Sequence, residues 1–214
     1  MSDERKLLRT LLDRAGTTYA EQAGIRLKDG PAPLYRLLVL SILLSTRIKA
    51  DIAVDASRSL ADAGMGTPAK MREASWQDRV DALSRASYKR YDESTATALG
   101  EGAELVHREY RDDLRKLRER AERDPARIRE ALTGFPRLGP VGADIFCREA
   151  QDVWPELRPA IDGKALDGAR RVGLPADADE LARLAPGSQL APLAAALVRV
   201  ALDRSLADEV RAGA

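Results

Sequence analysis

Cysteine and histidine are nearly absent from this sequence, which holds only Cys147 and His107 among its 214 residues. A lone cysteine forms no intrachain disulfide, as is typical of proteins from a reducing compartment. One thiol and one imidazole cannot assemble a zinc site or an iron–sulfur cluster, so we expect neither cofactor. A Ser-His-Asp or Cys-His nucleophilic system would need His107, but its charged neighbours in HREYRDDL favour an exposed helical histidine. Cys147, which follows an apolar Ile-Phe pair, is expected to be a small buried thiol.

Aromatic residues, excess charge and long apolar runs are also scarce. Aromatics make up 4% of the chain and the formal net charge is +1, so binding of nucleic acid would need a local basic face. The longest apolar run, about ten residues including a serine, is too short to span a bilayer. The charged N-terminal stretch MSDERKLLRTLLDRAG has no apolar core of signal-peptide length. We therefore expect a soluble cytoplasmic protein with no membrane partner.

The residues that are abundant, namely Ala, Leu and Arg, favour helices, and β-branched residues are few. Apolar residues recur at helical spacing through most of the chain, which predicts an all-α protein. The segment 34–44 is apolar nearly all round and is expected to be the central helix. The other predicted helices span 4–15, 51–63, 68–74, 76–86, 91–117 with a possible break near 112–113, 125–132, 141–150, 164–173, 178–184 and 189–204.

The stretch LTGFPRLGPVGAD, residues 132–144, is the richest cluster of Gly and Pro and predicts a tight turn between two helices. In such a hairpin the amides at the start of the second helix point outward, with the positive end of its dipole, and can hold a DNA phosphate without reading a base. Gly139 and Gly142 would allow the phosphate to approach closely. An ordinary helix–turn–helix corner explains this segment equally well.

A second candidate lies downstream in PAIDGKALDGARRVGLP, where Asp162 precedes a predicted helix. A lone aspartate in a loop most often caps a helix, and Asp162 is suited to cap the helix that begins near Lys164.

Taken together and in order, these motifs resemble the endonuclease III-like DNA glycosylases of the helix-hairpin-helix superfamily, over residues 34–174. LLVLSILLSTRIKADIAV is similar to the second helix of that family and the polar corner after it. FPRLGPVGADI is similar to its Leu-Pro-Gly-Val-Gly hairpin, and IDGKALDGARRVGL to its Val-Asp-Thr-His stretch. The resemblance implies two helical lobes, residues 31–155 with the hairpin and residues 1–30 plus 156–214, with a DNA-binding cleft and Asp162 at its mouth.

The family extrudes a damaged or mismatched base from duplex DNA and breaks its N-glycosidic bond. The resemblance makes Asp162 the catalytic carboxylate, which stabilises positive charge on the sugar or activates water. It implies a monomer that is associated with the nucleoid and binds damaged duplex DNA, and it allows a monovalent cation at the hairpin carbonyls. Arg47 takes the place of the family's gap-filling residue, although a plain surface arginine at a helix end is the alternative. The expected DNA-binding residues are Arg47, Arg137, Leu138, Gly139, Val141, Gly142 and Lys164.

The sequence departs from the family at several positions. Where members with lyase activity carry a catalytic lysine, this chain has Asp144, which cannot form a Schiff base and is expected in the first turn of its helix. The family's Pro-Gly is reversed to Gly139-Pro140, which predicts an altered turn, because proline cannot supply a positive φ. Without the four cysteines of a cluster, the C-terminal helix is expected to pack by apolar contact alone.

Two alternatives to a glycosylase without lyase activity follow from these departures. One is a non-catalytic DNA-binding or damage-sensing protein of the same fold. The other is an abasic-site lyase that uses Lys164 as its amine.

Overall fold

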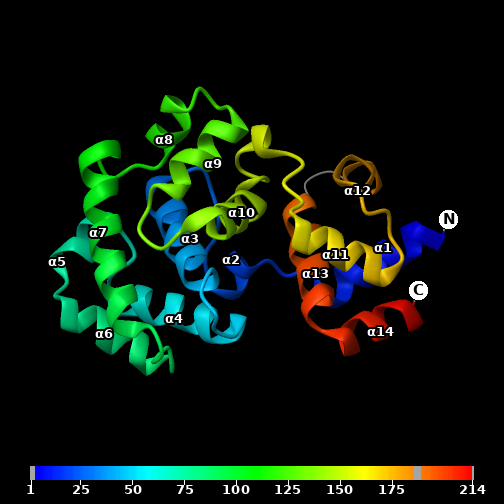
Figure 1. Cartoon of the computed structure of the whole chain (residues 1–214), viewed down its shortest axis with the longest axis horizontal. Helices are drawn as coiled ribbons and strands as arrows, with labels where there is room; N and C mark the ends of the chain where they lie inside the picture. The colour runs from blue at the N-terminus through cyan, green and yellow to red at the C-terminus, as the bar shows by residue number, and fades with distance from the viewer. Residues whose placement is uncertain (1–2, 186–188, 214) are drawn as a thin grey trace. The chain divides into compact units, whose positions relative to one another are not determined.

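The computed structural model describes residues 3–185 and 189–213, and every regular element in these residues is a helix (Figure 1). This confirms the all-α prediction. The chain divides into two compact units, Met1–Tyr19 with Cys147–Ala214 (unit 1) and Ala20–Phe146 (unit 2).

Unit 2 contains most of the helices. These are α2 (Tyr19–Gln22, which begins at the last residue of unit 1), α3 (Pro31–Leu44), α4 (Ala50–Asp62), α5 (Pro68–Glu73), α6 (Trp76–Arg85), α7 (Asp92–Tyr110), α8 (Arg115–Arg120), α9 (Pro125–Thr133) and most of α10 (Gly139–Ala150). Unit 1 contains α1 (Asp3–Ala15), the end of α10, a short 3-10 helix η1 (Pro155–Leu157), α11 (Gly163–Val172), α12 (Ala178–Leu184), α13 (Leu190–Leu202) and α14 (Arg204–Ala212).

The unit boundaries lie after residues 19 and 146, whereas the sequence interpretation placed them after 30 and 155. Two contacts explain the difference. The Arg36 guanidinium donates to the carbonyl of Ala23 at 3.1 Å, which ties the segment after α2 to α3. The side chain of Glu149, in the last turn of α10, accepts from the Tyr19 amide at 3.3 Å and so joins that turn to unit 1.

Helix α3 forms the centre of unit 2, as its composition predicted. Apart from Arg36, its side chains from Leu34 to Leu43 are buried, and Figure 1 shows it among α4, α7, α9 and α10. Burial of a whole leucine-rich helix provides the main apolar driving force for this unit, at roughly 2 kcal/mol for each fully buried leucine. Cys147, on α10, is buried as expected.

Six of the described α-helices begin at a residue whose side chain caps them. The side chains of Thr67, Ser75 and Asp124 accept from backbone amides in the first turns of α5, α6 and α9, and Ser75 forms a full capping box. The predicted break in 91–117 is also present, because Arg111 and Asp112 both adopt positive φ and end α7. His107 lies near that end with its side chain 53% exposed, 3.0 Å from Asp112 Oδ2.

Three expectations were wrong, and two of them concern helix ends. Helix α10 begins at Gly139, not Val141, so Asp144 lies in the second turn rather than the first. Helix α13 stops at Leu202, because Asp203 leaves helical geometry and caps a further helix, α14, that the sequence interpretation missed.

The third error concerns how α13 packs. Figure 1 shows α13 beside α11 and α1, and its apolar face is buried. It does not pack by apolar contact alone, however. The Arg199 guanidinium donates to the carbonyls of Ala15 and Thr17, and it lies 4.5 Å from the centroid of the Tyr19 ring.

Among the described residues, no helix combines the length and the apolar character needed to cross a bilayer.

Candidate functional site

Three segments of unit 2 that are distant in sequence meet at one place. They are the corner after α3 (residues 45–49), the linker before α7 (residues 86–91) and the hairpin between α9 and α10 (residues 134–142). Ser45 Oγ donates to the Arg137 carbonyl at 3.2 Å, which joins the corner to the hairpin. The hydroxyls of Thr46 and Tyr88 are hydrogen-bonded at 2.9 Å, which joins the corner to the linker.

The backbone of the hairpin has its positive φ angles before the proline, and whether this turn differs from that of the family stays a prediction. Positive φ falls on Arg137 at 61° and on Gly139 at 54°, and proline follows at the second position of α10. A proline there is tolerated because the first amides of a helix have no intrahelical acceptor. Gly139 thus adopts the left-handed conformation. Pro140 lies in the first turn of α10, where its missing N–H costs no hydrogen bond.

The hairpin presents donors to its surroundings. Within the described part of the chain, the amides of Gly139 and Val141 have no hydrogen-bond acceptor. Val141 itself is 64% exposed, which is unusual for a valine. Two free amides at the positive end of a helix dipole are suited to an anion.

The remaining hairpin residues hold the turn in place. Leu138 is buried. Gly142 is also buried, its amide donates to the Leu138 carbonyl at 3.0 Å, and a Cβ there would lie 2.7 Å from Leu138 Cδ1. Gly142 therefore accommodates the packing of Leu138, and the close phosphate approach expected of it stays a prediction.

The hairpin, the linker and the corner each carry an arginine. Arg137 is exposed, donates to Ser94 Oγ at 3.2 Å and lies 5.6 Å from the centroid of the Tyr91 ring. Arg90 lies 5.3 Å from the same ring. Arg47 is exposed in the corner, without a hydrogen bond or ion pair to any described residue.

Sequence reasoning missed Arg90, Tyr91 and Ser94 as neighbours of the hairpin. The only signal was the local concentration of Lys, Arg and Tyr in YKRYDES, which gave no indication of the long-range contact.

In unit 1, Asp162 caps α11. Its Oδ1 accepts from the Ala165 amide at 3.0 Å, which confirms the capping interpretation. Its Oδ2 accepts from Nη1 of Arg148, on the last turn of α10. The side chains of Arg148 and Asp162 are 5% and 12% exposed, so this ion pair is largely buried. No pattern in the sequence indicated this pair.

The two residues considered for a lyase step have other neighbours. Asp144 is paired with Arg129 of α9, which joins the two helices of the hairpin. Lys164 is exposed on α11, and its ammonium lies 3.7 Å from Asp167 Oδ2 in the same helix.

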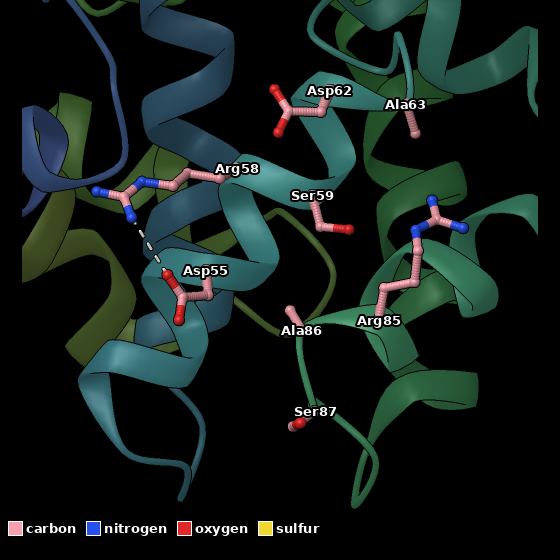
Figure 2. Close-up of a pocket in the computed structure, with 8 residues that line it drawn as sticks. All are labelled: Asp55, Arg58, Ser59, Asp62, Ala63, Arg85, Ala86 and Ser87. Carbon is pink, nitrogen blue, oxygen red and sulfur yellow. Dashed lines mark hydrogen bonds and ion pairs between the residues drawn. The ribbon is translucent and has the colours of Figure 1, made fainter.

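A groove of about 610 Å³ lies elsewhere on unit 2, between α4 and the end of α6 (Figure 2). Asp55, Arg58, Asp62 and Arg85 line it, and Arg58 is paired with Asp55 at 3.3 Å. None of the site residues predicted from the sequence lines this groove.

No family model and no curated protein matches the chain. Among solved structures, the chain is similar to one of a trapped covalent intermediate between endonuclease III and DNA, an estranged-adenine complex. The identity is 14%, the match covers 92% of this chain and 85% of the other, and the TM-score is 0.49.

Proposed function

We propose that this protein is a DNA glycosylase of base-excision repair, which hydrolyses the N-glycosidic bond of a damaged or mismatched base extruded from duplex DNA. The observation that carries the proposal is the carboxylate of Asp162, which the Ala165 amide and the Arg148 guanidinium fix and whose side chain keeps 12% of its surface exposed. A carboxylate held in one orientation can act on a sugar, because it needs little reorganisation when positive charge develops there.

Duplex binding is assigned to the hairpin and the cations around it. The free amides of Gly139 and Val141 suit one backbone phosphate, and Arg137 and Arg47 add charge nearby. Contacts to phosphates position a duplex without reading its sequence, so a lesion can be found in any context. This local basic face is consistent with the nearly neutral whole chain.

The proposed reaction is a hydrolysis. The bond between C1′ of the sugar and the base nitrogen breaks, a C1′–O bond forms with water, and the proton lost by the water replaces the sugar on the departing base. Asp162 either stabilises the cationic sugar or accepts the proton of the attacking water first. Strand cleavage by β-elimination is not part of the proposal. Asp144 is a carboxylate, and the ammonium of Lys164 lies on the surface of α11 beside Asp167.

The test is a panel of duplexes that each carry one uracil, oxidised pyrimidine, alkylated purine or mismatched base. Base release and strand nicking are scored separately. We expect release without nicking for at least one duplex, and loss of that release in Asp162→Asn with duplex binding retained. Full release by Asp162→Asn would remove Asp162 from the mechanism. A borohydride-trapped adduct with abasic DNA would instead favour a lyase that uses Lys164.

A second candidate function is a damage-sensing protein that binds duplex DNA without releasing a base. It is favoured by one observation, namely that both carboxylate oxygens of Asp162 already accept hydrogen bonds within the chain. The guanidinium also offsets part of the negative charge that would stabilise a cationic sugar. Tight binding to a lesion duplex with no release from any member of the panel is the result expected of this candidate.

A further inference from the structure

Asp162 follows a loop that has almost no regular structure of its own. Residues 151–162, here called the Asp162 loop, contain only η1, and yet they end in the carboxylate with the most constrained surroundings in the candidate site. Two side chains hold this loop. Gln151, its first residue, binds its backbone, and Arg148, in the last turn of α10, binds the Asp162 carboxylate.

Gln151 holds the backbone. Its side chain is completely buried, and its amide group binds both polar groups of Ala160. Nε2 donates to the Ala160 carbonyl at 3.1 Å, and Oε1 accepts from the Ala160 amide at 3.0 Å. Nε2 also donates to the Arg148 carbonyl at 3.0 Å, which fixes the side chain against α10. The position of Ala160, two residues before Asp162, is therefore set from α10.

Arg148 holds the carboxylate. Its side chain is almost fully buried, so the guanidinium has been removed from water, and its Nη1 donates to Asp162 Oδ2. Its Nε is buried without a hydrogen-bond acceptor in the described part of the chain. Burying a guanidinium with an unused donor costs free energy. Replacing a buried ion pair by apolar side chains of similar volume is often neutral or stabilising. The residue is therefore better explained by what it does to Asp162 than by stability.

We propose that Arg148 and Gln151 are positioning residues, which together hold the Asp162 carboxylate in the orientation needed for base release. This inference rests on the proposed glycosylase function. Arg148 fixes Oδ2, the Ala165 amide fixes Oδ1, and Gln151 fixes the backbone that carries them. Misplacement of a reacting group by about 1 Å can lower a rate about 100-fold, so such a brace has a direct kinetic consequence.

The kinetic test uses the full chain and a lesion duplex from which it releases a base. It separates the single-turnover rate of base release from the Kd for the duplex. We expect Arg148→Met to lower the rate about 100-fold while the Kd stays unchanged. Arg148→Lys keeps a cation without the planar fork and should lower the rate less. Gln151→Met should also lower the rate without changing the Kd. The matched control is Arg170→Met, which removes an exposed arginine paired with Asp167 on α11 and should change neither quantity.

A second readout does not depend on activity. The Ala165 amide reports on Asp162 because it donates to Oδ1, so its NMR resonance and its rate of exchange with solvent should change in Arg148→Met and in Gln151→Met. The Leu206 amide is the internal reference, because it donates at 3.1 Å to Asp203, the cap of α14 in the same unit. It should not change.

The proposal is overturned if the folded variants release base at the full rate, or if the Ala165 amide stays unchanged while only thermal stability falls. If Arg148→Met does not fold, Arg148→Lys and Gln151→Met provide both readouts. If the unchanged chain releases no base from any duplex, the proposed function fails, and the Ala165 amide alone then decides whether the two side chains orient Asp162.

Discussion

The hairpin and the Asp162 loop differ in how their hydrogen-bonding groups are used. In the hairpin, the amides of Gly139 and Val141 have no acceptor within the described residues and Val141 is exposed. In the Asp162 loop, the side chain of Gln151 and both oxygens of Asp162 are fully engaged within the chain. Under the proposed function, the free amides of the hairpin would be available to a phosphate of the duplex, whereas the Asp162 carboxylate would be held in one orientation by its neighbours.

The largest effect on stability is expected when the Asp162 side chain is removed. Asp162→Ala removes the cap of α11 and leaves the buried Arg148 guanidinium unpaired, so the free energy of unfolding should fall by about 3 to 5 kcal/mol. Urea denaturation followed by circular dichroism measures this. The double variant with Arg148→Met should lose less, because it removes the uncompensated charge. If the double variant is the less stable of the two, the ion pair does not account for the loss.

In the hairpin, the most sensitive position is expected to be Gly139, because its backbone adopts a positive φ. Gly139→Ala forces a side chain onto a positive φ and should lower the free energy of unfolding by about 1 to 2 kcal/mol, while it also weakens duplex binding. Gly102→Ala is the matched control. That helical glycine has open space around it, and the substitution should be neutral or stabilising. Equal losses in both variants, measured by denaturation, would contradict a special conformation at residue 139.

A smaller effect is expected from the cation beside the hairpin. Arg137→Ala should weaken duplex binding and reduce the slope of log K against log salt by about 1, because one phosphate contact is lost. Fluorescence anisotropy over a salt series measures the slope. Arg170→Ala, on the exposed face of α11, serves as the control and should leave it unchanged. An unchanged slope in Arg137→Ala would place its guanidinium away from the phosphates.

The smallest effect concerns the pH dependence of the Asp162 loop. Burial raises the pKa of Asp152 above its ordinary value of 3.8, and it outweighs the opposing influence of the Ala191 amide and the Arg158 guanidinium. A raised carboxyl pKa contributes stability below the ordinary value, and this contribution is lost as the pH rises through the folded-state pKa. Relative to Asp152→Asn, the unchanged chain should therefore lose unfolding free energy as the pH rises above about 3.8. An unfolding free energy of the unchanged chain that instead rises with pH, relative to Asp152→Asn, would contradict a raised pKa of Asp152.

What could be predicted from the sequence was mostly local. The caps at Thr67, Ser75, Asp124 and Asp162 act over three residues, so a short window of sequence contains all the chemistry involved. The buried helix α3 was equally clear, because its composition leaves no polar face.

What could not be predicted depends on distance along the chain. The pair between Arg148 and Asp162 joins residues 14 apart across an irregular loop, and no periodicity indicates it. The contact between Arg137 and Ser94 spans 43 residues. Helix α14 was missed for a different reason, since Asp203 ends one helix and caps the next, and the apolar pattern continues across it.

The proline in the hairpin has one more consequence. Its ring fixes φ at the start of α10 before any ligand arrives, and the buried side chain of Leu138 further restricts the turn. A loop that is already ordered gives up less conformational entropy when a phosphate docks on it, so more of the interaction energy remains as affinity. Under the proposed function, such preorganisation would strengthen the binding of a backbone phosphate to the amides of Gly139 and Val141.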